Sequence, residues 1–336
     1  MDINVGLIGC GYWGKNLIRN FMETENCWLS AICDTNKGLL EKFNKRYPSL
    51  STHTDYKAII DSKEINAVAV VTPVHQHYRL AKEALLADKH VLVEKPLAAS
   101  VAEAKELVAL AEEKNKVLMV DHTFLYTGAI RKMKGLIDAG EIGDILYYDS
   151  VRVNLGLFQE DINVIWDLAP HDLSIMDYLL RERPVSVMAV GSAHVKEGIE
   201  NIGYLILNFD SNLIAHFHFN WLSPVKIRLT LICGSEKMIT YDDLVPGESL
   251  KVYDRKVEVM DSDEAHDKLL YDYRVGDMWA PKVELMEALR LVCGEFVNSI
   301  LEQRAPLTDG ESGLRIVRIL EAAQRSIKNN GVEVKL

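Results

Sequence analysis

The sequence lacks the features that mark several protein classes. Its five cysteines are odd in number and contain no C-x-x-C pair, which argues against a disulfide framework and against a structural zinc site. No apolar run approaches the roughly 18 residues that a membrane helix needs. The amino-terminal segment has no basic stretch of the signal-peptide kind. We therefore expect a cytoplasmic protein with no membrane partner.

Acidic side chains outnumber basic side chains in this sequence. The chain of 336 residues has 38 lysines and arginines against 49 aspartates and glutamates, a formal net charge of −11. Such a charge gains little from a phosphate backbone, so we expect no nucleic-acid partner. Apolar residues make up 48% and charged residues 26%, which is typical of soluble globular proteins. The length suits about two domains.

The first part of the chain alternates strands with helices. Its strands are apolar on both faces, as in buried parallel sheets, and are expected at 5–8, 28–33, 67–71, 90–93 and 116–120. Ser100 and Glu103 form a capping box at the start of one of the helices between them. This rhythm predicts an α/β fold whose first domain, residues 1–122, is a doubly wound parallel sheet of the Rossmann kind.

Residues 123–336 have a different rhythm. Strands follow one another in series, and in 213–222 apolar Leu213, Ala215, Phe217, Phe219 and Trp221 alternate with a mixed second face. Such alternation indicates a mostly antiparallel sheet with two chemically different faces. Two helices are expected near 283–303 and 309–329, the second capped by Asp309. The polar and aromatic stretch 255–280 is expected to be irregular.

A glycine-rich turn follows the first strand directly. Gly9, Gly11 and Gly14 fit G-x-G-x-x-G, in which the glycines permit a tight turn, approach of a pyrophosphate and close helix packing. Asp34 ends the second strand, where a carboxylate binds ribose hydroxyls and repels a 2′-phosphate. The pattern favours NAD over NADP. The alternative is a purely structural turn with Asp34 as a strand-end cap.

Four motifs occur in a characteristic order: the glycine turn, the segment Thr72–His77, Glu94-Lys95-Pro96, and Asp167-x-x-x-His171. In this order the chain resembles the Gfo/Idh/MocA family of NAD(P)-dependent sugar oxidoreductases, over its whole length. The resemblance implies a Rossmann domain followed by an α/β domain, here 123–336, with a large, mostly antiparallel, open-faced sheet. That open face commonly forms the family's subunit interface, so we expect a homodimer or a homotetramer.

The resemblance also assigns roles to residues. It implies that His171 accepts the substrate's hydroxyl proton, for which an imidazole is suited. Lys95 would stabilise the developing charge on the oxygen, and Asp167 would orient His171 or contact the substrate. Lys95 and His171 should then meet between the domains. From the residues alone, D-x-x-x-H is better explained as a helix cap and a partly buried histidine, and the resemblance reverses this preference.

The cofactor cleft should be lined by eleven residues and bordered by Asp121. They are Gly9, Gly11, Tyr12, Trp13, Gly14, Asp34, Thr72, Pro73, His77, Glu94 and Lys95.

Two further segments indicate the class of substrate. Tyr12–Asn16 and Trp166–Asp172 are most similar to the nucleotide-sugar dehydrogenases, of which the UDP-N-acetylglucosamine and glucuronate 3-dehydrogenases are the nearest type. A polyol dehydrogenase of the inositol type and a silent NAD-binding regulator are the alternatives, and the joint presence of Lys95 and His171 argues against silence. No metal is expected, because the pairs His75/His77 and His216/His218 lack a third ligand.

Overall fold

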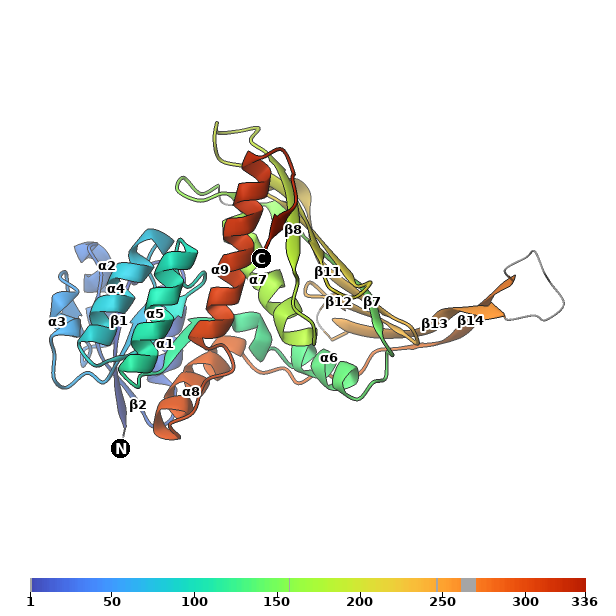
Figure 1. Cartoon of the computed structure of the whole chain (residues 1–336). Coiled ribbons are helices and arrows are strands. Elements are labelled where there is room, and N and C mark those ends of the chain that lie inside the picture. The colour runs from blue at the N-terminus through green and yellow to red at the C-terminus, as the bar shows by residue number, and fades with distance from the viewer. Residues whose placement is uncertain (1, 157, 246, 261–269) are drawn as a thin grey trace. The chain divides into compact units, whose positions relative to one another are not determined.

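The computed structural model describes residues 2–156, 158–245, 247–260 and 270–336. By their contacts they form two compact units (Figure 1). Unit 1 comprises Met1–Tyr126 and Met286–Glu321, and unit 2 comprises Thr127–Leu285 and Ala322–Leu336.

Unit 1 is built on a six-stranded parallel sheet with the strand order β3-β2-β1-β4-β5-β6. Its elements are β1 (Ile3–Ile8), α1 (Gly14–Met22), β2 (Cys27–Cys33), α2 (Lys37–Arg46), β3 (Ser51–His53), α3 (Lys57–Ile60), β4 (Ala67–Val70), α4 (Val74–Leu86), β5 (His90–Glu94), α5 (Val101–Glu113), β6 (Leu118–Asp121), the 3-10 helix η1 (Thr123–Tyr126) and α8 (Ala288–Leu301). The order reverses at β1, so the carboxyl ends of β1 and β4 form a switch point where such sheets bind ligands. The predicted doubly wound sheet is confirmed.

Local sequence explains the elements of unit 1. All four residues of β4 are buried, as an apolar strand covered on both faces should be. The Ser100 hydroxyl accepts the backbone N–H of Glu103 at 3.3 Å, and the Glu103 carboxylate accepts the N–H of Ala99 at 3.1 Å. The predicted capping box therefore forms, with its return bond one residue earlier than usual.

Residues 286–321 pack in unit 1, although the domain boundary predicted at residue 122 assigns them to the second domain. Helix α8 lies against α1 and η1. The Thr308 hydroxyl donates to the carbonyl of Val120 at 2.6 Å, and Asp309 forms a β-bridge with Met119. This packing joins segments far apart in the chain, which residue patterns do not reveal.

Unit 2 contains a nine-stranded sheet with the order β14-β13-β12-β11-β7-β10-β9-β8-β15. Its elements are α6 (Gly128–Asp138), β7 (Ile145–Leu155), α7 (Val164–Leu179), β8 (Ser186–Ser192), β9 (Ile202–Asn208), β10 (Ile214–Asn220), β11 (Leu222–Gly234), β12 (Met238–Asp242), β13 (Leu250–Met260), β14 (Leu270–Trp279) and β15 (Val334–Lys335). Helix α9 (Gly310–Lys328) contributes to both units. Among the described strands of this sheet only β7 and β10 pair in parallel, which confirms a mostly antiparallel sheet.

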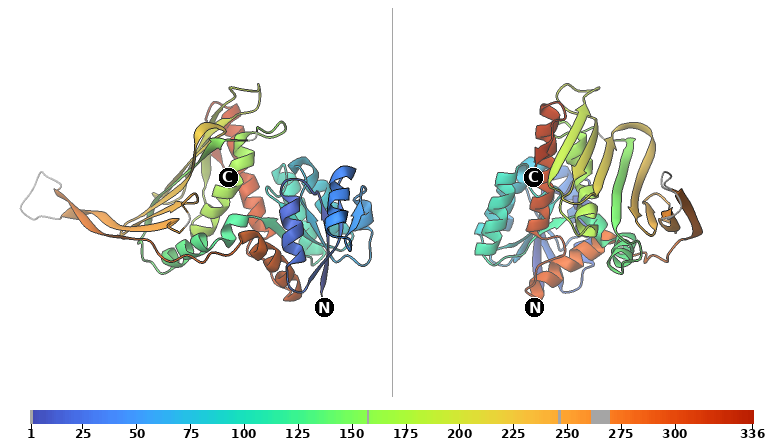
Figure 2. Two further views of the ribbon diagram at one scale, coloured as in Figure 1. Left: turned by 180° about the vertical axis from the view of Figure 1, so that it is seen from behind. Right: turned by 45° about the vertical axis from the view of Figure 1, so that its right-hand side comes forward.

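The two faces of this sheet differ as predicted. Phe217, Phe219 and Trp221 are buried, and α7 packs against β7, β9 and β10 (Figure 2). On β10 the alternate residues Ile214 and His216 are exposed or half-buried. Strand alternation therefore produces one core face and one face that remains partly apolar at the surface.

The expectation of an irregular segment at 255–280 is wrong for its described part. β13 and β14 pair antiparallel as a long ribbon, with Val252 opposite Trp279 and Arg255 opposite Val275. Its aromatic and β-branched residues favour strands, and cross-strand pairing decides between irregular and extended backbone here. The rest of the predicted segment, 261–269, lies outside the described residues.

Candidate active site

The glycine turn is shaped by close backbone contacts. Gly9 has φ = +101°, and a Cβ there would lie 2.1 Å from the carbonyl oxygen of Val71. A Cβ on Gly14 would lie 2.1 Å from the carbonyl oxygen of Gly9, so α1 packs directly on the turn. At Gly11, by contrast, a Cβ would meet nothing within 4 Å. Among the residues that the structure describes, none covers the backbone of Gly11 and no side chain caps the amino end of α1, so both are open to a ligand.

Asp34 joins this turn to the end of β2. Its Oδ2 accepts the backbone N–H of Cys10 at 2.8 Å, and its Oδ1 accepts the N–H of Asn36 at 2.8 Å. Each carboxylate oxygen retains a second acceptor site for a ribose hydroxyl. The carboxylate therefore serves as a strand-end cap and is also placed for the predicted role.

A cavity of about 450 Å³ adjoins Asp34. Gly9, Gly11, Thr72 and Pro73 line it together with three residues that were not among the predicted site residues, namely Tyr56, Gln76 and Arg79. The Arg79 guanidinium donates to the Tyr56 hydroxyl at 2.9 Å and to Gln76 Oε1 at 2.7 Å. A planar group bordered by an aromatic ring and a guanidinium would fit such a wall.

Tyr12 and Trp13 form an exposed rim at the start of α1. Their rings meet edge to face with centroids 5.4 Å apart, and their exposed fractions are 67% and 45%. The Lys15 ammonium lies 4.8 Å from the centre of the Tyr12 ring. Neither ring lines the cavity beside Asp34. Their predicted contact with a cofactor stays a prediction.

His77 connects two loops at the carboxyl edge of the parallel sheet. Its ring nitrogens lie 2.8 Å from the carbonyl oxygen of Pro96 and 2.7 Å from that of Thr72. Burial lowers the pKa of His77, while the two carbonyls favour the charged ring. His77 is 1% exposed. It thus links the loop after β4 to the loop after β5.

Glu94 and Lys95 stand at the end of β5, and the Lys95–Pro96 peptide is cis. Glu94 Oε2 accepts the backbone N–H of Lys95 at 3.0 Å. Its neighbour across the sheet is Asp121, the last residue of β6. Burial and the Asp121 carboxylate raise the pKa of Glu94, and Lys95 opposes this shift. Burial also raises the pKa of Asp121.

His122 was not identified from the sequence. It is buried, and neither ring nitrogen has a hydrogen-bond partner among the described residues. Burial, with the charges of Lys95 and Arg315, lowers its pKa to about 3. In the sequence, only the position of His122 next to Asp121 pointed to a place in the site. A histidine after an apolar strand is common, so this signal is weak.

In unit 2, α7 carries Asp167 and His171. Asn163 caps the helix by accepting the N–H of Trp166 at 3.1 Å, which places Asp167 in the first turn. The indole N–H of Trp221 donates to Asp167 Oδ2 at 3.2 Å. Four residues later, His171 lies on the same face of the helix. The motif thus includes the start of a helix, and the role of Asp167 and His171 in proton transfer stays a prediction.

A buried ion pair anchors the middle of α7. Asp172 accepts from both Arg152 Nε and Nη2 and from the Ser150 hydroxyl at 2.9 Å, so β7 holds the helix next to His171. Arg152 and Asp172 are almost fully buried. This support was not found from the sequence because its partners lie on separate elements.

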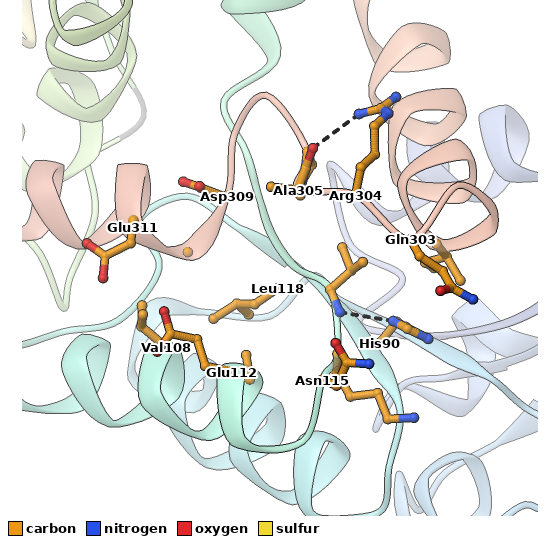
Figure 3. A pocket seen from close by; sticks show the side chains of 16 residues that line it. His90, Val108, Glu112, Asn115, Leu118, Gln303, Arg304, Ala305, Asp309 and Glu311 are labelled. Atoms are coloured by element: carbon orange, nitrogen blue, oxygen red, sulfur yellow. Dashed lines mark hydrogen bonds between the residues drawn. The ribbon is translucent and has the colours of Figure 1, made fainter.

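A second cavity in unit 1, of about 320 Å³, lies where β5 and β6 begin (Figure 3). His90 Nδ1 accepts the N–H of Val117 at 2.9 Å there, and Glu112 and Glu311 line the walls. Burial lowers the pKa of His90 to about 4. The cavity beside Asp34 lies at the carboxyl ends of the strands, so this second cavity lies at the opposite edge of the same sheet.

Within the described ranges, no three histidine, cysteine, aspartate or glutamate side chains group as a metal site. Of the helices that the structure describes, none has both the length and the apolar character for a membrane crossing.

Family models match both units of the chain. The Gfo/Idh/MocA oxidoreductase model for the NAD-binding Rossmann fold matches residues 3–122, and that for the Gfo/Idh/MocA C-terminal domain matches residues 130–240.

Individual relatives are distant. A 1-carboxy-3-chloro-3,4-dihydroxycyclohexa-1,5-diene dehydrogenase of Comamonas testosteroni is 26% identical over 229 residues, which are 65% of this chain and 58% of the relative. A dTDP-3,4-didehydro-2,6-dideoxy-α-D-glucose 3-reductase of Saccharopolyspora spinosa is 26% identical over 249 residues, 71% and 74% of the two chains. The UDP-N-acetylglucosamine 3-dehydrogenase structure of Acidithiobacillus ferrooxidans shares the fold, with a TM-score of 0.82 at 23% identity and coverage of 98% and 99%.

Proposed function

Because the chain belongs to the Gfo/Idh/MocA family of NAD-binding oxidoreductases, we propose that it is an NAD-dependent dehydrogenase of sugars. The observation that carries the proposal is the junction of the glycine turn with Asp34. The open backbone at Gly11, the uncapped start of α1 and the carboxylate at the cavity edge fit the pyrophosphate and ribose of NAD. When bound, NAD supplies the hydride acceptor.

The chain's own residues would handle the proton. His171 accepts the proton of the substrate hydroxyl, and the Lys95 ammonium stabilises the negative charge that develops on that oxygen. Asp167, held by the indole of Trp221, orients the imidazole from the preceding helical turn. Buried Asp172 and Arg152 hold the same helix in place. The mechanism requires Lys95 and His171 to reach one substrate oxygen, within about 3 Å each.

We infer further that the substrate is a nucleotide sugar. The Saccharopolyspora relative is named as a dTDP-sugar reductase, and the Acidithiobacillus structure as a UDP-sugar dehydrogenase. The segments Tyr12–Asn16 and Trp166–Asp172 support the same class by resemblance. A free polyol is the alternative substrate.

Formation of NADH, followed by absorbance with a panel of UDP-sugars, dTDP-sugars and polyols, tests this function. Lys95→Ala and His171→Ala should each lower turnover by about 10²–10⁴-fold, the usual loss for a positioned acid–base group. Glu112→Gln, at the far cavity, serves as the control and should retain activity. Turnover of polyols alone would replace the nucleotide-sugar assignment, and full activity of both alanine variants would overturn the mechanism.

A further inference from the structure

Two carboxyl groups lie side by side at the carboxyl edge of the parallel sheet. Strands β5 and β6 are neighbours, and the register pairs Glu94 with Asp121, the last residue of each strand. Adjacent strands are about 4.8 Å apart, and paired residues project from the same face. Asp121 is buried and Glu94 is half-buried, and two carboxylates at this separation repel each other in such a setting.

The surrounding groups satisfy only part of the hydrogen-bonding capacity of this carboxyl pair. Asp121 is 1% exposed, and its Oδ1 accepts the Thr123 hydroxyl at 2.6 Å. Its Oδ2 is buried and has no hydrogen-bond partner within the ranges that the structure describes. Glu94 accepts one backbone N–H, that of Lys95. Ionising both groups would leave buried negative charge that is incompletely bonded, which is costly.

The charged and titratable groups around the pair come from four parts of the fold. Lys95 follows β5, His122 follows Asp121, and Cys293 on α8 and Arg315 on α9 face the group formed by Asp121 and His122. Burial keeps His122 uncharged, with a pKa of about 3, and burial raises the pKa of the Cys293 thiol well above its usual value. Lys95 is thus the cation that acts on both carboxyl groups, whereas Arg315 acts on the neighbouring His122.

We propose that Glu94 and Asp121 together hold one proton near neutral pH, and that releasing it shifts the protein's preference from NADH toward oxidised NAD. The proposal rests on the proposed function: because Lys95 is assigned to the reacting oxygen, the nicotinamide ring that accepts the hydride should lie near the ends of β5 and β6. The nicotinamide ring is a cation in oxidised NAD and neutral in NADH, so one added negative charge nearby favours the oxidised form. Burial raises the pKa of both carboxyls, in agreement with a retained proton. Asp121 is thereby a positioning residue that acts through the charge around Lys95.

Binding measurements on the whole protein test this without a substrate. NADH affinity is read from its fluorescence, and oxidised NAD from competition, at several values between about pH 5.5 and pH 9. We expect the ratio of the NAD dissociation constant to that of NADH to fall about tenfold with rising pH, the effect of one charge over roughly 10 Å at a protein's effective dielectric. In Asp121→Asn the fall should move to lower pH, because Glu94 loses its repelling neighbour.

The control is Glu112→Gln, which removes one negative charge at the opposite edge of the same sheet and should leave the pH profile unchanged. If Asp121→Asn does not fold, Glu94→Gln is the variant to use in its place. Infrared spectra of the unmodified protein should show a protonated carboxyl band at neutral pH that is lost in Asp121→Asn. A pH-independent ratio, or no such band, overturns the proposal and leaves the dehydrogenase assignment intact. Failure to bind either nucleotide at any pH overturns both.

Discussion

At the scale of single residues, Asp34 combines two tasks. It accepts backbone N–H groups from Cys10 and Asn36 and borders the nucleotide cavity. Its negative charge should oppose a 2′-phosphate. The local hydrogen bonds and the cofactor preference therefore depend on one carboxylate.

Replacing this carboxylate gives the first prediction. Asp34→Ala should weaken NAD binding about tenfold or more, since a charge-assisted hydrogen bond is lost, and should narrow the gap to NADP. A nearby arginine added to this variant should favour NADP further. Fluorescence titration with both reduced cofactors measures the two affinities. Equal affinity for both in the unmodified protein would contradict the assignment.

His122 gives a prediction about acid stability. Its folded pKa is lowered to about 3, whereas an unfolded histidine titrates near 6.5. Between about pH 6.5 and pH 3, His122 is protonated in the unfolded state but not in the folded state. The free energy of unfolding therefore falls as the pH is lowered through this range. His122→Phe removes the effect. Relative to the unmodified protein, its free energy of unfolding should improve by up to about 1.4 kcal/mol for each pH unit below 6.

Urea unfolding of both proteins at pH 7.5, 6 and 5 measures that difference. The values at pH 7.5 serve as the reference, because the unfolded imidazole is then mostly neutral. A difference that is constant with pH would show that His122 does not titrate in this way.

At the scale of elements, turns rather than helices carry most of the residues proposed to bind the cofactor. The loops after β4 and β5 are joined by the buried ring of His77. Since Lys95 belongs to the second loop, the position of a residue proposed for catalysis depends on a histidine on α4. The sequence motif alone suggested only a residue near the cofactor.

His77→Ala should therefore destabilise the protein and weaken cofactor binding together. Loss of two buried hydrogen bonds and a packed ring should lower the free energy of unfolding by about 2–4 kcal/mol. His75→Ala, which changes an exposed side chain on the same helix, is the matched control. Thermal unfolding with and without NAD measures both effects. Unchanged stability and NAD affinity in His77→Ala would show that this bridge is dispensable.

At the scale of the whole molecule, the sheet of unit 2 presents an apolar surface. Met188, Val190, Tyr204 and Ile214, on three adjacent strands, are each 38–52% exposed. The aromatic ring of Tyr204 stacks on His218 with centroids 4.4 Å apart. Apolar surface of this kind commonly becomes buried between subunits.

We predict that this face is buried in a homo-oligomer. Val190→Glu combined with Tyr204→Glu should shift the protein toward the monomer, because two charges would be buried at the contact. Light scattering at micromolar concentration measures the mass. Leu86→Glu, which alters an exposed apolar residue of α4, should leave the assembly unchanged. A monomeric unmodified protein would rule the prediction out.

The sequence by itself determined the features that depend on neighbours in the chain. The glycine turn, the strand of 67–71, the capping box at Ser100 and the alternation through 213–222 follow from steric limits, burial on both faces and local hydrogen bonds. Each of these forces acts over a few residues. Consequently the parallel sheet, the mostly antiparallel sheet and the identity of the glycine-turn residues were predictable.

Only the tertiary structure decided what depends on distant segments. It packs residues 286–321 with the first unit, pairs β13 with β14, and brings Tyr56 and Arg79 to the cavity beside Asp34. It also places Asp121 against Glu94 and buries His122 beside them. The physical reason is that sheet order and strand register determine which side chains become neighbours. Burial then alters the pKa values of those neighbours, and neither effect is a property of any short stretch of sequence.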